Sequence, residues 1–169
     1  CTHLIFISSF CSSKESEKII SPLAVSWAAN ERIVSDWDPE MKQLNNYDAL
    51  LVAPATRNTI AKHIHGITDS PVMMSLAAAR GSKTPIVFIP SMHQDIFDDP
   101  VTEDLLHQIE KEGNYYLHST KIEDKVKQPD SIQIVADFAH IINSKNIDRQ
   151  IIAITLGANR APIDAVRAI

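Results

Sequence analysis

Apolar runs alternate with amphipathic stretches along this chain, and the alternation predicts strands separated by helices. Residues 48–54 (DALLVAP) and 84–90 (TPIVFIP) are apolar without polar alternation, which is typical of parallel strands buried on both faces. Further strands are predicted at 3–8, at 114–119, and at the start of 150–169, where a turn and a helix start follow. Helices are predicted at 14–30, 58–67, 70–81, 99–113 and 130–143.

Proline and glycine mark the predicted helix boundaries. Pro22 lacks an amide donor and is expected to break the helix at 14–30. Gly81 and Gly113 are expected to stop the helices that precede them, since glycine readily takes the left-handed conformation found after helix ends.

The order of these elements predicts an α/β fold. Strands spaced by helices favour right-handed crossovers and an open, doubly wound, mostly parallel sheet, covered on both faces to give three layers. Ligands of such sheets bind beyond the carboxyl ends of the strands. Polar residues follow both long strands, in VAPATRNT and FIPSMHQDIF, so a binding site is predicted there.

The first strand end carries residues that suit an oxygen-rich, flat ligand. Pro54 is expected to stop ladder pairing, and Ala55 is small enough to let a ring approach the backbone. Thr56, Asn58 and Thr59 lie where the next helix starts, with free amides that suit a phosphate or a ribityl chain. The alternative is that Asn58 is only the N-cap of that helix.

The second strand end offers one titratable side chain. His93 is a candidate acid–base group, because histidine titrates near neutrality. The alternatives are structural: Asp98 or Asp99 caps the following helix, and Met92 belongs to the core rather than to a cofactor site.

Composition narrows the function classes. The chain has 169 residues, a net charge of -5, 44% hydrophobic and 22% charged residues, which argues against nucleic-acid binding. No apolar run reaches the length of a membrane span, and a cytoplasmic protein is expected. Cys1 and Cys11 form no CxxC pair, and His63 and His65 are spaced by two, so no metal site is predicted.

Three blocks of the sequence resemble the homo-oligomeric flavin-containing cysteine decarboxylases. APATRNTIAKHIHGITDS resembles their PAxANTxAKxxxGxxDD motif, and PIVFIPSMHQDIFDDPVTEDLLHQIEKEG resembles PxxxxPAMNxxMxxxPxxxxNxxxLxxxG. SEKIISPLAVSWAANERIVSDWD is similar to xxFIxPLTFxxLSGNxVxxDxWD. The tail, 154–169, is similar to the opening of phosphopantothenate–cysteine ligases. Together they resemble the bifunctional phosphopantothenoylcysteine decarboxylase/ligase family, with a decarboxylase-type domain at 1–145 and a linker and ligase opening at 146–169.

The resemblance implies a flavodoxin-like fold, an FMN cofactor, and trimers or multiples of trimers with flavin at subunit contacts. It implies decarboxylation of 4′-phosphopantothenoylcysteine to 4′-phosphopantetheine, with the chemistry carried by the cofactor. By match, the residues toward FMN are Ser8, Ser9, Pro54, Ala55, Thr56, Asn58, Thr59 and Met92. By match, the nucleotide-side loop of the ligase piece holds Gly157, Asn159, Arg160 and Asp164.

The sequence also departs from the family pattern. The stretch before the 48–54 strand, DPEMKQLNNYD, lacks the family's catalytic histidine, and His93 replaces the asparagine of PxMN. The ACGxxGxGR clamp is absent between Gly113 and Pro129, and the first strand with its Gly-Ser-Ile loop is missing. One hypothesis is therefore a diverged enzyme that uses His93, and another is an inactive flavodoxin-like scaffold or FMN-binding module. A third, an unrelated doubly wound domain, is disfavoured by the three blocks. Residues 150–159 are a candidate replacement for the missing strand.

Overall fold

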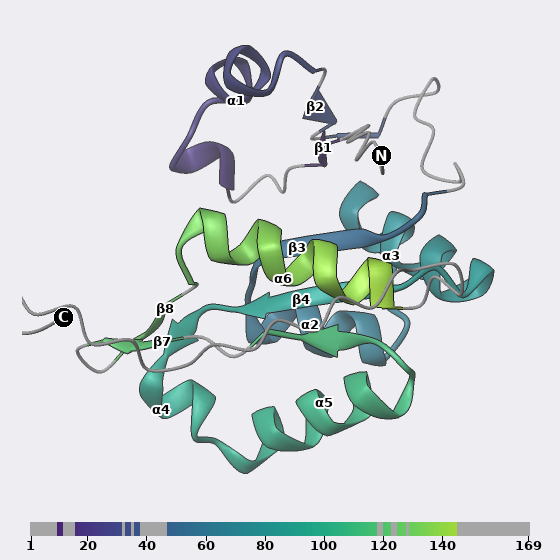
Figure 1. The fold of residues 1–169 in the computed structure, drawn as a ribbon, viewed down its shortest axis with the longest axis vertical. Coiled ribbons are helices and arrows are strands. Elements are labelled where there is room, and N and C mark those ends of the chain that lie inside the picture. Colours follow the sequence, from purple (N-terminus) through teal and green to yellow (C-terminus); the bar gives the residue numbers. More distant parts are fainter. Residues whose placement is uncertain are drawn as a thin grey trace, which may run out of the picture.

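The centre of this computed structural model is a three-stranded parallel sheet (Figure 1). The structure describes residues 10–11, 16–31, 33–34, 36–37, 47–117, 120–122, 125–127 and 129–144. The sheet has the order β3–β4–β6, and both of its pairings are parallel. Its strands are β3 (Leu50–Ala55), β4 (Ile86–Pro90) and β6 (Tyr115–Tyr116). The strands predicted within 48–54, 84–90 and 114–119 are confirmed.

Helices connect the strands, as parallel pairing requires. The two connections hold α2 (Arg57–Ile64) and α3 (Pro71–Ser82), then α4 (Gln94–Phe97) and α5 (Pro100–Lys111). The last described helix is α6 (Ser131–Ser144). Residues of α2, α3 and α5 share one buried cluster with β4, whereas α6 crosses in front of β3 and β4 in Figure 1. The predicted α/β fold with helices on both faces is confirmed.

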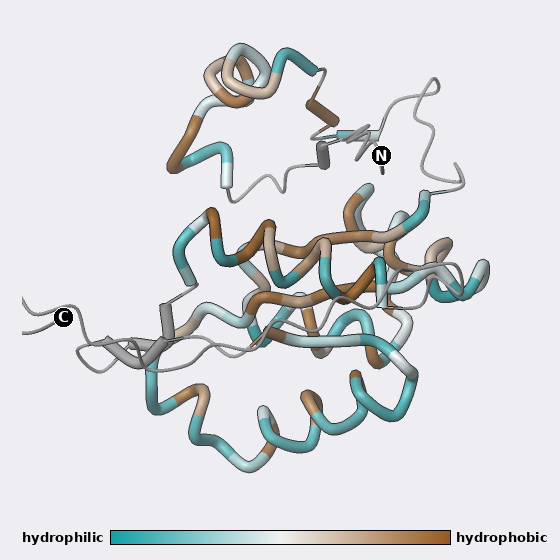
Figure 2. Tube along the Cα trace, in the orientation of Figure 1, coloured by the Kyte–Doolittle hydropathy of each residue, from teal (hydrophilic) through white to brown (hydrophobic). Residues whose placement is uncertain are grey.

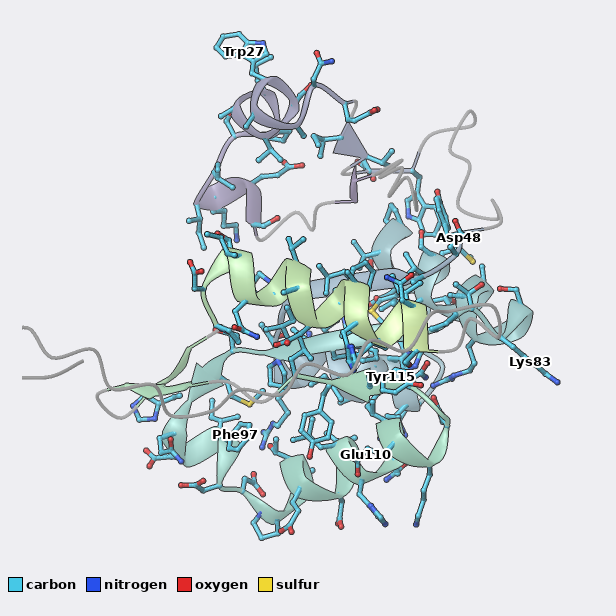
Figure 3. All side chains as sticks on the ribbon, viewed as in Figure 1. Trp27, Asp48, Lys83, Phe97, Glu110 and Tyr115 are labelled. Carbon is cyan, nitrogen blue, oxygen red and sulfur yellow. The ribbon has the colours of Figure 1, made fainter. Side chains whose placement is uncertain are left out.

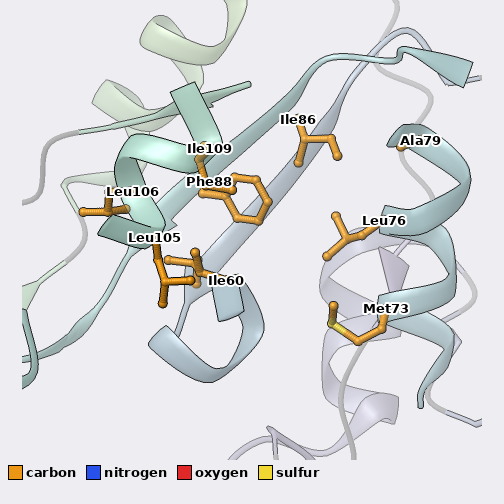
Figure 4. Packing of buried hydrophobic residues seen from close by; sticks show 10 residues of the cluster. Ile60, Met73, Leu76, Ala79, Ile86, Phe88, Leu105, Leu106 and Ile109 are labelled. Atoms are coloured by element: carbon orange, nitrogen blue, oxygen red, sulfur yellow. The ribbon is translucent and has the colours of Figure 1, made fainter. Parts of the chain in front are cut away.

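The core is built on β4, whose five residues are all buried. Ile86 and Phe88 belong to the cluster shared with the helices (Figure 4), whereas the intervening Val87 and Ile89 are buried outside it, as alternation across a strand requires. Figure 2 shows the hydrophobic colouring along β3 and β4 and the hydrophilic colouring along much of α5. The prediction that β3 is buried on both faces is wrong, because Leu51 is 37% exposed.

The amino-terminal part forms a separate small unit in the view of Figure 1. Its elements are β1 (Phe10–Cys11), the 3-10 turn η1 (Ser16–Lys18), α1 (Pro22–Ala29) and β2 (Ile33–Val34), with β1 and β2 parallel. Pro22 begins α1 rather than breaking it, because an amide at the first helical position has no partner within the helix. Trp27 points away from the rest of the molecule in Figure 3 and is 76% exposed.

A second small sheet, absent from the predictions, adjoins the end of β4. It has the order β5–β8–β7 and is antiparallel. Its strands are β5 (Met92–His93), β7 (Thr120–Ile122) and β8 (Lys125–Lys127). Strands of two or three residues carry too little periodicity to be recognised from sequence.

Two helix ends differ in how well they follow the predictions. Gly113, with φ 78°, ends the turn after α5 as expected. Gly81 does not stop α3, which continues to Ser82. Lys83 takes the left-handed position instead, with φ 59°, and its N–H donates to the carbonyls of Ala79 and Arg80.

Several predictions fall outside the described residues. They are the strand at 3–8, the strand and turn at 150–169, the replacement strand at 150–159, and the segment 146–169. The candidate site residues there are Ser8, Ser9, Gly157, Asn159, Arg160 and Asp164.

Candidate functional site

The two polar strand ends that the sequence singles out lie next to each other. Ala55 of β3 is in register with Pro90 of β4. The N–H of Ser91 donates to the carbonyl of Ala55 at 3.0 Å. The pairing skips Ala53 and Pro54 and resumes at Ala55, so Pro54 interrupts the ladder rather than ending it. The segments that follow β3 and β4 therefore leave the sheet at the same edge.

The start of α2 is organised by two threonines. Thr56 is the N-cap, and its Oγ1 accepts from the N–H of Thr59 at 3.3 Å and lies 3.1 Å from Thr59 Oγ1. The interpretation of Asn58 as the N-cap is therefore wrong, since Asn58 is the second residue of the helix. Its side chain is exposed and has no hydrogen-bond partner among the residues that the structure describes. A carboxamide in this position can donate to or accept from a ligand.

The two residues before Thr56 differ in exposure. Ala55 is fully buried in the core cluster, and Pro54 is exposed. Both the methyl group and the backbone of Ala55 are therefore covered, and of these two residues only Pro54 is exposed at this end of the sheet.

His93 is half-exposed at the other strand end. It closes β5 and is the N-cap of α4, where its Nδ1 accepts from the N–H of Asp95 at 3.4 Å. Asp95 Oδ2 lies 3.2 Å from the same nitrogen. The N–H and the carboxylate of Asp95 thus both lie at Nδ1, so Nε2 is the ring nitrogen left to contact a ligand. Met92 is partly buried and packs against the core, in agreement with its structural interpretation.

An ion pair that the sequence analysis missed links the two strand ends. Arg57 Nη1 lies 2.5 Å from Oδ2 of Asp99, 42 residues away. Asp99 is the N-cap of α5, as one of the sequence alternatives predicted, and its Oδ1 accepts from the N–H of Val101 at 3.0 Å. These two contacts, first that of Val101 and then that of Arg57, lower the pKa of the Asp99 carboxyl. A contact across 42 residues has no local sequence signal.

The opposite end of α2 holds a polar cluster in which His63 is buried and the side chains of Arg80 and Glu112 are each 32% exposed. His63 Nε2 lies 3.3 Å from Glu112 Oε2 without the alignment of a hydrogen bond, and its ring packs on that of Phe88 with centroids 5.2 Å apart. Arg80 donates to the His63 carbonyl at 2.5 Å and lies 3.0 Å from Glu112. Burial, and next the charge of Arg80, lower the pKa of His63 to about 4.

The geometry of this cluster suits packing rather than ligand binding. His63 is buried, whereas His65 is exposed at the end of α2, so the two rings point in different directions as predicted. Among the described residues, no group of three or more His, Cys, Asp or Glu side chains is arranged to hold a metal ion. Within the same residues, no helix has the length and apolar character needed to cross a membrane.

Comparison with known proteins finds one matching family. The sequence model of the Flavoprotein family matches residues 7–154. A coenzyme A biosynthesis bifunctional protein, CoaBC, from Thermococcus kodakarensis is 30% identical over 164 residues, which cover 93% of this chain and 40% of that protein. The chain thus spans about two fifths of the length of this curated relative.

Solved structures share the fold. The FMN binding protein AtHal3 matches with a TM-score of 0.68 at 17% identity, over 80% of this chain and 81% of that one. A PPC decarboxylase variant complexed with pantothenoylaminoethenethiol matches with a TM-score of 0.66 at 17% identity, over 78% and 80% of the two chains. At these identities the likeness shows the fold alone, and it agrees with the flavodoxin-like arrangement that the sequence predicted.

Proposed function

The chain belongs to the flavoprotein family, and from that membership we propose that it binds FMN where β3 and β4 end. We propose that it is the decarboxylase-type part of a coenzyme A biosynthesis protein, acting on 4′-phosphopantothenoylcysteine. The name of the T. kodakarensis relative and the ligand named with the PPC decarboxylase structure support the pathway and the substrate class. The observation that carries the proposal is the Ser91–Ala55 hydrogen bond, which brings the two polar strand ends together.

The residues at this edge fit such a cofactor. Asn58 carries an exposed carboxamide with no partner among the described residues, and it follows a helix start whose first-turn amides favour anionic oxygen. His93, half-exposed on the neighbouring segment, adds a second polar group. A flat, phosphate-bearing ligand needs a site for its anionic oxygens and polar groups that orient the rest of the molecule.

The protein's own groups would hold and orient the reactants. When bound, FMN would take two electrons from the cysteinyl thiol of the substrate, so that the neighbouring carboxylate can leave as carbon dioxide, and would return the electrons to give 4′-phosphopantetheine. Asn58 would hydrogen-bond the ligand, and His93 would donate a proton from Nε2 or take one there, since Asp95 occupies Nδ1. Thr56 and Thr59, which bond to each other, would fix the position of Asn58 rather than contact the ligand through free hydroxyls.

The larger organisation is also part of the proposal. Residues 1–145 would form the flavin-binding domain and 146–169 the opening of a ligase domain, with Gly157, Asn159, Arg160 and Asp164 toward a nucleotide. Ser8 and Ser9 would lie near the flavin. A trimer-based homo-oligomer would complete the site. The resemblance of the tail to ligases and the bifunctional name of the relative support this organisation.

The alternative function is an FMN-binding module without decarboxylase activity. Two features of the sequence favour it: His93 stands where the family motif has asparagine, and the segment after Gly113 holds no cysteine. In that segment the structure has the β7–β8 hairpin, which pairs with the strand of His93.

Two measurements test the proposal in sequence. Addition of FMN to the purified 169-residue chain should quench flavin fluorescence and shift the visible absorption bands; absence of saturable binding at micromolar FMN would overturn the proposal. The second measurement is release of carbon dioxide from 4′-phosphopantothenoylcysteine. Loss of this release in His93→Ala would support the diverged enzyme, provided that the control His107→Ala, which changes an exposed histidine of α5, keeps it. Binding without release would support the FMN-binding module.

A further inference from the structure

We infer that Arg57 and Asp99 are positioning residues whose ion pair closes the loop carrying His93 against the start of α2. The inference rests on the proposed function, because the loop and the helix start are the two sides of the proposed flavin site. Neither residue is assigned a contact with the ligand.

Both ends of the loop that carries His93 contact one short stretch of the chain, residues 55–57. At its beginning, the N–H of Ser91 donates to the carbonyl of Ala55 at 3.0 Å. At its end, Oδ2 of Asp99 lies 2.5 Å from Nη1 of Arg57. Residues 91–99, which include His93, therefore form a loop whose two ends meet residues 55 and 57. This arrangement sets the separation between the loop and Asn58, the next residue of α2.

The Ser91–Ala55 hydrogen bond and the Arg57–Asp99 ion pair position different parts of the molecule. The Ser91–Ala55 bond continues the sheet and is present whenever β3 and β4 pair. The Arg57–Asp99 contact joins side chains at the starts of two helices, so together with the packing of Phe97 and α5 on the core it sets how close α4 and the start of α5 lie to α2. Without it, the loop would still be held by the β5–β8 pairing, by the packing of Phe97 on the core and by the hydrogen bond from Thr102 Oγ1 to the Ile96 carbonyl, but no side-chain contact would join its end to the start of α2.

The charges and the exposure of Arg57 and Asp99 indicate that their ion pair positions the loop rather than stabilises the fold. Arg57 is always charged, and Asp99 is charged at neutral pH, where its contacts with Val101 and Arg57 keep the pKa of the carboxyl below its ordinary value. Their side chains are 38% and 36% exposed, and pairs this accessible add little to folding stability.

Asp99→Asn separates the two roles of the Asp99 side chain. Asparagine keeps a capping oxygen for the N–H of Val101 and removes the charge that attracts Arg57. Arg57→Gln removes the other charge, Arg57→Lys keeps it, and the double variant Arg57→Gln/Asp99→Asn completes a cycle. Asp69→Asn is the matched control, because Asp69 forms an ion pair at 2.6 Å with Lys62, which lies in α2 as Arg57 does.

The first readout is the dissociation constant of FMN, with the visible circular dichroism of the bound flavin. A pair this exposed changes an equilibrium by no more than about fivefold, so its loss should lower the population of the closed arrangement and raise the dissociation constant by up to about fivefold. Arg57→Gln, Asp99→Asn and the double variant should show similar increases, Arg57→Lys a smaller one, and Asp69→Asn none. Additive effects in the double variant, or unchanged binding in all three, would overturn the inference.

The second readout needs no FMN and separates this inference from the proposed function. Amide hydrogen exchange of the purified chain should be faster in residues 91–98 of Asp99→Asn than of the wild type, with exchange in α3 unchanged. If the wild type binds no FMN, the proposed function fails and exchange still decides whether the pair closes the loop. Equal exchange in wild type and Asp99→Asn would overturn the inference whatever the flavin binding.

Discussion

Helices α2 and α5 are joined by charged groups at both of their ends, but the two junctions differ in burial. At the amino-terminal ends, Arg57 and Asp99 form an ion pair that is more than one third exposed. At the carboxyl-terminal ends, His63 is buried between Phe88 and Glu112. The pKa of His63 is lowered to about 4, because burial disfavours its charged form.

The difference separates two uses of charge in one pair of helices. Water screens the exposed pair, so it can fix a distance at little gain in folding free energy. At the other junction His63 is buried, so charging its ring or removing the charged donor to its carbonyl changes the free energy of unfolding. We therefore expect changes at the carboxyl-terminal junction to affect stability, and changes at the amino-terminal junction to affect the proposed site.

The largest expected effect is the pH dependence that His63 produces. Its pKa is about 4 in the folded chain and 6.5 ordinarily, so the unfolded chain binds the proton first as the pH falls. The stability contributed is complete above pH 6.5 and is lost as the pH falls to 4, by up to about 3 kcal/mol. Urea unfolding at several pH values should show this loss, and His63→Gln should show a smaller one. Equal slopes in both proteins would contradict the assignment to His63.

Arg80→Leu should give the next largest effect. It removes the donor to the carbonyl of His63 and the charge beside Glu112. We expect a loss of about 2 kcal/mol in the free energy of unfolding, since the hydrogen bond that is lost has a charged donor, while the N–H of Gly66 still donates to the same carbonyl at 3.1 Å. Chemical denaturation measures it, with Lys83→Leu, an exposed cation beyond the same helix, as the control. An unchanged denaturation midpoint would show that the buried junction does not stabilise the fold.

Thr56→Ala should have a smaller effect at the amino-terminal junction. The substitution removes the oxygen that accepts from the N–H of Thr59. The loss of an N-cap costs about 1 kcal/mol, and Thr56→Ser should restore it, because serine keeps the hydroxyl. If thermal unfolding finds the alanine and serine variants equally stable, the cap is not what stabilises this end of α2.

Arg57→Gln should have the smallest effect on stability. The pair that it removes is exposed, so the melting temperature should match that of wild type within error. Calorimetry of the two proteins makes the measurement. A decrease as large as that of Arg80→Leu would show that both junctions act in the same way and would remove the distinction drawn between them.

Periodicity and terminal residues predicted most of the fold. The unbroken apolar run in β4 corresponds to a strand buried on both faces. Asp98 and Asp99 were the two candidate caps before an amphipathic helix, and Asp99 is the cap. β3 has nearly the same composition, yet Leu51 is partly exposed. The composition of a segment identifies it as a strand, but how far the strand is buried depends on which distant segments pack on it.

The candidate site was predictable in its place but not in its contacts. The rule that ligands bind at strand ends located Asn58 and His93 correctly beside neighbouring strands. The cap of α2 was misassigned because Thr56 and Asn58 are both good capping residues, and only the backbone decides between them. The partner of Arg57 lies 42 residues away, and nothing local distinguishes Asp99 from the adjacent Asp98.

The two oxygens of Asp99 have separate partners, and this limits what evolution can place at that position. Glutamate would keep the charge but is a poor cap, and serine or threonine would keep the cap but not the charge. A saturation library at position 99, sorted first for abundance and then for retained flavin, should therefore yield two different sets of tolerated residues. Aspartate would be the residue that both selections enrich.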